Sequence, residues 1–214
     1  MKKIMFNDSC GLTQAVLEGH KTMTRRVMSI DFYNSLDMVA YSNGDMECFM
    51  DRDGDFIDFR YTTKTPYQLG EIVAVAQSYH ALNKAGYVAP EWLDHACESS
   101  AGYNNKMFVR AELMPYRIKI TNIKVERLQD ISDEDCLKEG VQKGFIGYYV
   151  DGLKTKDWEK ESHVETADGK TFKLFPYPQE AFAALIDKVC GRGTWNINPY
   201  VFVYEFELLK GGKK

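Results

Sequence analysis

Residues able to attack a carbonyl or to bind an anion are concentrated in one short stretch, GHKTMTRR, which begins at Gly19. The stretch combines an amine, hydroxyls and guanidiniums, supplied by Lys21, Thr22, Thr24, Arg25 and Arg26. A threonine hydroxyl becomes an effective nucleophile when a neighbouring base removes its proton, and a lysine can be that base if burial or nearby cations lower its pKa. The same groups also suit the binding of a nucleotide, and a solvated basic loop is a third interpretation.

The residues before this stretch predict how the fold holds it. Residues 7–9 supply candidate helix N-caps, apolar side chains follow at helical spacing in residues 12–16, and Gly19 stands where a left-handed residue ends a helix. The chain is therefore expected to leave a helix through a tight turn and to become extended at Lys21. Strand alternation would turn Lys21 and Thr24 to opposite sides, whereas an irregular segment would let them converge.

The GHKTMTRR stretch resembles the G-x-K-T-x-T-R-R signature of ASCH-domain proteins, which are members of the PUA-like superfamily. Two later stretches fit the same family: VERLQDISDED, which begins at Val125 and runs on to Glu139, and WNINPYVFV, which begins at Trp195. Their order and wording are similar to those of phage- and prophage-type ASCH proteins in particular. Together the matches are more specific for a fold than for an activity.

The resemblance implies an α+β fold, namely a PUA-like, mostly antiparallel β-barrel with short flanking helices and, in this chain, inserted hairpins. In ASCH proteins the signature lines a cleft. Bacterial N4-acetylcytidine amidohydrolases are similar to this chain at the signature, and their catalytic lysine, threonine and glutamate fall on Lys21, Thr24 and Glu139. In such chemistry Thr24 attacks the acyl carbon, Lys21 takes its proton, and Glu139 protonates the leaving amine or activates water.

The candidate ligand-binding residues are Thr22, Arg25, Arg26, Gln77, Trp195 and Asn198. Gln77 follows an apolar strand at a position where many ASCH proteins carry an acidic residue. Its amide can bind a base edge but cannot act as a general base. Trp195 either stacks on a base or plugs the end of the barrel, in which case Asn198 sets the turn into the last strand.

Composition limits the ligand. The formal net charge is -4, whereas a protein that follows a long nucleic acid through many phosphate contacts usually has a basic face. The densest basic group is Lys21, Arg25 and Arg26, so RNA contacted at one nucleotide or a modified nucleoside is the expected partner.

Cysteine and histidine usage gives no sign of a metal or a cofactor. The 5 cysteines and 4 histidines are scattered, and no C-x-x-C is present, so neither a disulfide framework nor a zinc site is predicted. No apolar run reaches the ~18 residues of a membrane span, and the start lacks the apolar run of a signal peptide. The expected location is cytoplasmic, and the sequence gives no oligomeric state.

The length of 214 residues suits a single domain, assigned to residues 1–209, with a flexible tail at 210–214. Insertions into that domain are expected at about 28–66, 80–105 and 142–177. Local patterns predict a buried strand at 72–76, a helix capped by Ser132 and ended by Gly140, an amphipathic helix after Pro178 with Phe182, Leu185, Ile186 and Val189 turned inward, and a barrel-closing strand at 200–208. Hairpin turns are predicted at Asn43-Gly44 and Asp168-Gly169.

The sequence leaves three hypotheses. The first is a PUA-like ASCH protein that binds RNA or a modified nucleoside in a cleft lined by the signature. The second gives the same cleft an amidohydrolase activity on N4-acylated cytidine. The third is a phage-derived interaction protein in which the insertions form the partner surface and the cleft has no catalytic role.

Overall fold

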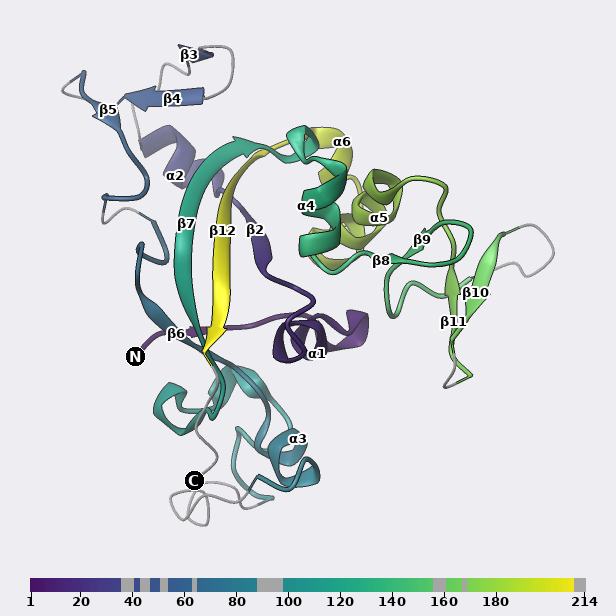
Figure 1. Cartoon of the computed structure of the whole chain (residues 1–214). Coiled ribbons are helices and arrows are strands. Elements are labelled where there is room, and N and C mark those ends of the chain that lie inside the picture. Colours follow the sequence, from purple (N-terminus) through teal and green to yellow (C-terminus); the bar gives the residue numbers. More distant parts are fainter. Residues whose placement is uncertain are drawn as a thin grey trace.

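A computed structural model describes the chain except residues 36–40, 43–46, 51–53, 63–64, 88–97, 156–160, 167–168 and 210–214. Its main element is a 5-stranded sheet with the strand order β1-β6-β7-β12-β2 (Figure 1). These strands span Lys3–Ile4 (β1), Ile72–Val75 (β6), Arg117–Arg127 (β7), Tyr200–Leu209 (β12) and Met23–Val27 (β2). Strand β1 is parallel to β6, and the other neighbours are antiparallel. The predicted α+β class is confirmed, with a mixed sheet.

The described residues do not form a closed barrel, because β1 and β2 stand at the two edges of the sheet. Strand β12 was predicted to close a barrel, but it lies inside the sheet between β7 and β2. That position accounts for its being apolar on both faces. The two edges are linked by a side chain instead of a ladder: Arg26 of β2 donates from Nη2 to the carbonyl oxygen of Met5, just after β1, at 2.7 Å.

Phe6 fills the space between the two edges. Its ring centroid lies 5.7 Å from Cζ of Arg26 and 5.8 Å from Nζ of Lys21. On the core side, the centroid of the same ring lies 5.8 Å from the ring centroid of Phe206 on β12. Cations near an aromatic face are favourable partners, so Phe6 holds the signature against the first strand.

The helices of the described residues span Leu12–Leu17 (α1), Ile30–Ser35 (α2), Tyr79–Lys84 (α3), Asp133–Lys138 (α4), Pro178–Cys190 (α5) and Thr194–Ile197 (α6). Figure 1 shows α4 and α5 together beside the long strands. In α5 the predicted inward residues Phe182, Leu185 and Ile186 are buried, whereas Val189, in the last turn, is 41% exposed. None of these helices is long and apolar enough to cross a membrane.

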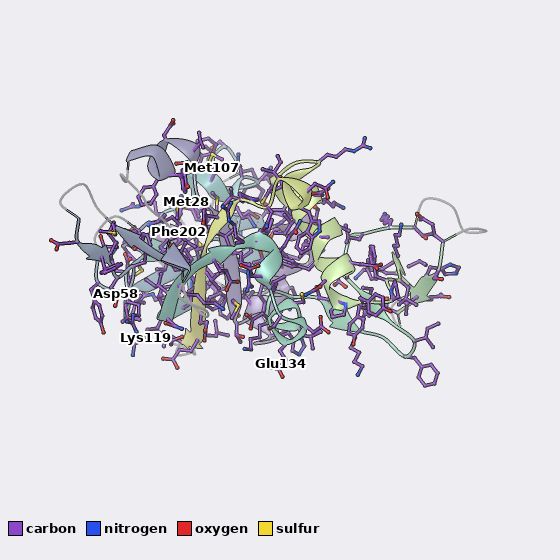
Figure 2. All side chains as sticks on the ribbon, turned by 90° about the horizontal axis from the view of Figure 1, so that it is seen from above. Met28, Asp58, Met107, Lys119, Glu134 and Phe202 are labelled. Atoms are coloured by element: carbon purple, nitrogen blue, oxygen red, sulfur yellow. The ribbon has the colours of Figure 1, made fainter. Side chains whose placement is uncertain are left out.

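Helix α4 forms as its sequence predicts. The Ser132 hydroxyl accepts a hydrogen bond from the Asp135 backbone N–H at 3.2 Å, and Gly140 has a φ of +106° after the last turn. Ile131 and Cys136 are both buried. The short helix therefore delivers Glu139 to a fixed place at its C-cap, while Glu134 lies on its outer surface (Figure 2).

The turn into β2 also follows its prediction, although the strand starts later. Gly19 has a φ of +79°, but the strand begins at Met23 and not at Lys21. The reason lies in the main chain of Thr22, whose N–H donates to the Lys138 carbonyl at 3.0 Å and whose carbonyl accepts from Phe206 at 2.9 Å. At Thr22, the last turn of α4 therefore accepts the main-chain hydrogen bond that a neighbouring strand would otherwise accept.

Small hairpins lie outside the main sheet and within two of the expected insertions. One is a 3-stranded sheet made of Tyr41–Ser42 (β3), Glu47–Met50 (β4) and Phe56–Ile57 (β5). The other two are 2-stranded: Gln142–Lys143 (β8) pairs with Tyr148–Tyr149 (β9), and His163–Glu165 (β10) pairs with Thr171–Lys173 (β11). The β10–β11 hairpin projects from the body of the molecule in both views (Figures 1 and 2). The predicted turns at 43–44 and 168 lie outside the described residues, between strands that do pair.

The Ser132 cap can be tested by unfolding. Replacing Ser132 with Ala removes the acceptor for the Asp135 N–H, and we expect the free energy of unfolding to fall by about 1 kcal/mol. Urea unfolding measures this, with Ser132→Asp as the control that keeps an acceptor. An Ala variant as stable as the wild type would show that the cap does not hold α4.

Candidate functional site

A buried ion pair joins the signature to the end of α4. Nζ of Lys21 lies 2.6 Å from Oε2 of Glu139 and 2.7 Å from the Glu139 carbonyl oxygen, across a sequence separation of 118. The two side chains are only 1% and 5% exposed. Gly140 follows Glu139 with a φ of +106°, and a Cβ there would crowd Leu12 Cδ2 at 3.0 Å, so this position favours glycine.

Arg25 is surrounded by carboxylates. Its guanidinium meets Glu126 at 2.5 Å, Asp135 at 3.1 Å and Glu139 at 3.2 Å, and its side chain is 1% exposed. Its Cζ also lies 5.9 Å from the ring centroid of Phe182 on α5. Through these contacts Arg25 connects β2 to α4 and α5. The surrounding carboxylates also neutralise its charge within the protein.

The surroundings of Lys21 lower its pKa below the value of a lysine in water. Burial lowers the pKa of Lys21, and the charges of Arg26 and Arg25 lower it further, while the Glu139 carboxylate opposes them. For Arg25 the net effect is the opposite. Burial alone would lower the pKa of its guanidinium, but the carboxylates of Glu139 and Glu126 outweigh burial and raise it. Of the two cations, Lys21 is the one whose pKa is lowered and Arg25 the one whose pKa is raised.

Thr24 lies on a different face of β2 from Arg25, as alternation requires. Thr24 pairs with Tyr204 across the β2–β12 ladder and is buried. Arg25, one residue along, donates to Met23 Sδ at 3.2 Å on the helix side. Both side-chain hydrogen bonds of Lys21 go to Glu139, so Lys21 and Glu139 are brought into contact, whereas Thr24 is close in the chain but is not bonded to Lys21.

The remaining sequence candidates occupy different places. Arg26 contacts Met5 and Phe6 at the sheet edge, and Thr22 joins β12 to α4 through its main chain. Gln77, just after β6, is buried, and its Oε1 has no hydrogen-bond partner among the described residues.

Trp195 and Asn198 are engaged in local structure at the approach to β12. The backbone N–H of Trp195 donates to the Asp187 carboxylate at 2.9 Å, and the Trp195 ring meets the Phe182 ring edge-on, with 6.1 Å between the ring centroids. The Asn198 side chain accepts from the Gln129 N–H at 2.8 Å, and its φ is +48°. These contacts place Trp195 in packing against α5 and Asn198 in the turn into β12.

Sequence reasoning did not select Glu126, Asp135, Phe6 or Tyr204 as members of this region. Asp135, whose backbone N–H donates to the Ser132 cap, also accepts a hydrogen bond from Arg25 through its side chain. Alternation along β2 and β12 was the available signal for Tyr204, because it places every second side chain beside Thr24. Nothing in the local sequence around Phe6 points to Lys21 or Arg26.

A cavity of about 710 Å³ lies elsewhere, between the first turn of the chain and β11. It is lined by Asp8, Ser9, Gly11, Asp151, Gly152, Lys154, Thr155, Gly169, Lys170, Thr171 and Phe172. Neither Lys21, Thr24 nor Glu139 reaches it. In the part of the chain that the structure describes, no group of three or more His, Cys, Asp or Glu side chains is placed to hold a metal ion.

Comparison with known proteins adds no relative. No family model matches the sequence, and neither the curated proteins nor the solved structures contain a match.

Asp135 gives the cluster a testable pH dependence. Burial would raise the pKa of Asp135, but hydrogen bonds from Lys138 and Arg25 outweigh it and hold the pKa below 3.8. A carboxyl with a depressed folded pKa stabilises the fold above its unfolded pKa, and that stability is lost as the pH falls through the folded value. We expect Asp135→Asn to be less stable than the wild type by a constant amount above about pH 5, with the difference shrinking below 3.8.

Urea unfolding over a pH series measures this difference, and Asp133→Asn, on the exposed side of the same helix, is the matched control. A difference that stays constant down to about pH 3 would contradict the stabilising role of the ionised Asp135.

Proposed function

We propose that this protein is a PUA-like ASCH protein that binds a single nucleotide of RNA or a modified nucleoside beside Lys21, Thr24 and Arg26. The observation that carries the proposal is the buried contact between Lys21 and Glu139 at 2.6 Å. The resemblance singled out these residues from opposite halves of the chain. A buried, hydrogen-bonded charge pair is expensive to assemble, which favours a role beyond packing.

The size of the ligand follows from the charges. Arg25 is neutralised by carboxylates, so the cations left for a ligand are Arg26 and, in exchange for Glu139, Lys21. The chain as a whole carries a formal charge of -4. Such a site supports one nucleoside or phosphate group and not a long phosphate track.

A second function, hydrolysis of an N4-acyl group on cytidine, is favoured by the lowered pKa of Lys21. Lys21 would first pass a proton to Glu139 and then, as the neutral amine, take the Thr24 proton as Thr24 Oγ attacks the acyl carbon. The C–N bond then breaks, and the amine leaves with a proton from Lys21 or Glu139. Water activated by Glu139 would hydrolyse the acyl-threonine ester and restore Thr24.

Incubation with N4-acetylcytidine tests both functions in one experiment. Cytidine release, followed by mass-resolved chromatography, is expected from the wild type and should fall ~10²–10⁴-fold in Thr24→Val and Lys21→Met. Thr121→Val removes an exposed hydroxyl of β7 and is the matched control, with release unchanged. Unfolding curves of all variants show whether the fold survives.

Binding is measured in parallel by calorimetric titration with N4-acetylcytidine, cytidine and a short RNA. Saturable binding without release would support the binding function and contradict the hydrolase. No saturable binding of any of these ligands would contradict the proposed function as a whole.

A further inference from the structure

The cavity of about 710 Å³ is separate from the signature, because none of the described residues that line it belongs to β2 or α4. Its volume lies within the roughly 300–1,000 Å³ that is usual for small-molecule sites. The lining forms two walls. The first wall consists of the turns at residues 8–11 and 151–152, and the second wall consists of residues 154–155 and 169–172.

The first wall is made of two turns in close contact. Gly152 has a φ of +79°, and a Cβ there would lie 1.8 Å from the Ser9 carbonyl oxygen. Gly11 has a φ of +65°, and a Cβ there would lie 2.8 Å from Asp151 Cβ. Glycine at both positions therefore lets the turns approach. Nζ of Lys188 on α5 donates to the Gly152 carbonyl oxygen at 2.6 Å, so the wall is fixed before a ligand binds.

The first wall carries two carboxylates, and each is held through its Oδ1 atom. Oδ1 of Asp8 accepts from Lys106 Nζ at 2.7 Å, and Oδ1 of Asp151 accepts from Gln142 Nε2 at 3.0 Å. The Asp8 side chain is nevertheless 64% exposed. This wall therefore presents carboxylates at defined positions.

The second wall carries two amines, those of Lys154 and Lys170. The Glu161 carboxylate accepts from the Thr155 hydroxyl at 3.1 Å and from Lys173 Nζ at 2.7 Å, so the segment that holds Lys154 is tied to β11. Lys170 directly precedes β11. Within the part of the chain that the structure describes, the Lys154 ammonium has no ion-pair partner.

The two walls thus carry opposite charges, while the lining as a whole is balanced, with two carboxylates and two ammonium groups. A simple anion is attracted by the second wall and repelled by the first, and the reverse holds for a simple cation. A ligand with both an ammonium and a carboxylate group is complementary to both walls.

We propose that this cavity binds a free α-amino acid. The ammonium group of the ligand lies against the carboxylates of the first wall, and its carboxylate lies against the amines of the second wall. Phe172, which also lines the cavity, offers apolar surface to the side chain of the ligand. The inference goes beyond the proposed function, because the cavity shares no residue with the nucleoside site.

Binding is tested on the full chain by saturation-transfer NMR with the proteinogenic L-amino acids supplied as one mixture, followed by calorimetry with the amino acid that binds. We expect saturable binding of at least one of them. Its analogues that lack either the carboxylate or the amine should each bind about tenfold more weakly, since each loses one charge-assisted contact. For phenylalanine these analogues are phenethylamine and 3-phenylpropionate.

Two substitutions assign the contacts to the walls. Lys154→Met should weaken binding of the amino acid about tenfold and leave binding of the amine analogue unchanged. Asp151→Asn keeps an oxygen for Gln142 and should weaken binding of the amino acid while leaving that of the acid analogue unchanged. Lys143→Met removes an exposed amine of β8 outside the cavity and is the matched control, with unchanged affinity.

The absence of saturable binding by any amino acid overturns the proposal. Equal affinity for the amino acid and its acid analogue also overturns it, because the site then takes a simple anion. Full affinity in both Lys154→Met and Asp151→Asn shows that the amino acid binds elsewhere and contradicts the assignment. Binding of N4-acetylcytidine by the same variants should equal that of the wild type, so failure of this inference can be told apart from failure of the proposed function.

Discussion

The structure depends on a buried cluster of charges between β2 and α4. Lys21 and Arg25 enter it from the signature, and Glu126, Asp135 and Glu139 enter it from β7 and the α4 segment. Removing one partner of a buried ion pair typically costs 3–5 kcal/mol, roughly, because the other charge stays buried without compensation. The helix cannot move away from the strand without breaking these contacts, so the position of Glu139 relative to Lys21 is tightly fixed.

Alternation along β2 divides the signature into two roles. Arg25 faces the helices and is neutralised there, so it acts in assembly of the fold. Thr24 and Arg26 face Tyr204, Phe202 and the first strand, and Nε of Arg26 is buried there without a hydrogen-bond partner among the described residues. Lys21 precedes the strand, contacts Glu139 on the helix side and lies near Phe6 on the other. It therefore connects the structural face of the signature to the face proposed for ligand binding.

Local features of this fold could be predicted from sequence because they depend on neighbours in the chain. The Ser132 cap, the left-handed Gly19 and Gly140, the amphipathic face of α5 and the strands at 72–75 and 200–209 are of this kind. The order of the strands in the sheet could not be predicted in this way. An apolar strand such as β12 shows that both faces are covered, but its sequence does not say which strands lie on either side.

In the site, too, residues close together in the chain could be predicted, whereas contacts between distant residues could not. Lys21 and Thr24 could be selected from the signature, but the contact of Lys21 with Glu139 spans 118 positions and was implied only by a family resemblance. The partners of Arg25 were missed because charged residues in β7 and α4 look like ordinary surface residues when each is read alone. Tyr204 was missed because the register of the β2–β12 ladder, and not the local sequence, sets which residue lies opposite Thr24.

The central claim is that Lys21 and Glu139 interact directly in the folded protein, and a double-mutant cycle with Lys21→Met and Glu139→Gln measures that interaction. The structure predicts a coupling in the free energy of unfolding of ~2 kcal/mol or more, well above the ~1 kcal/mol expected for the exposed pair Lys2–Glu71 measured in the same way. Effects of the two substitutions that add within ~0.5 kcal/mol would contradict the contact and with it the proposed site.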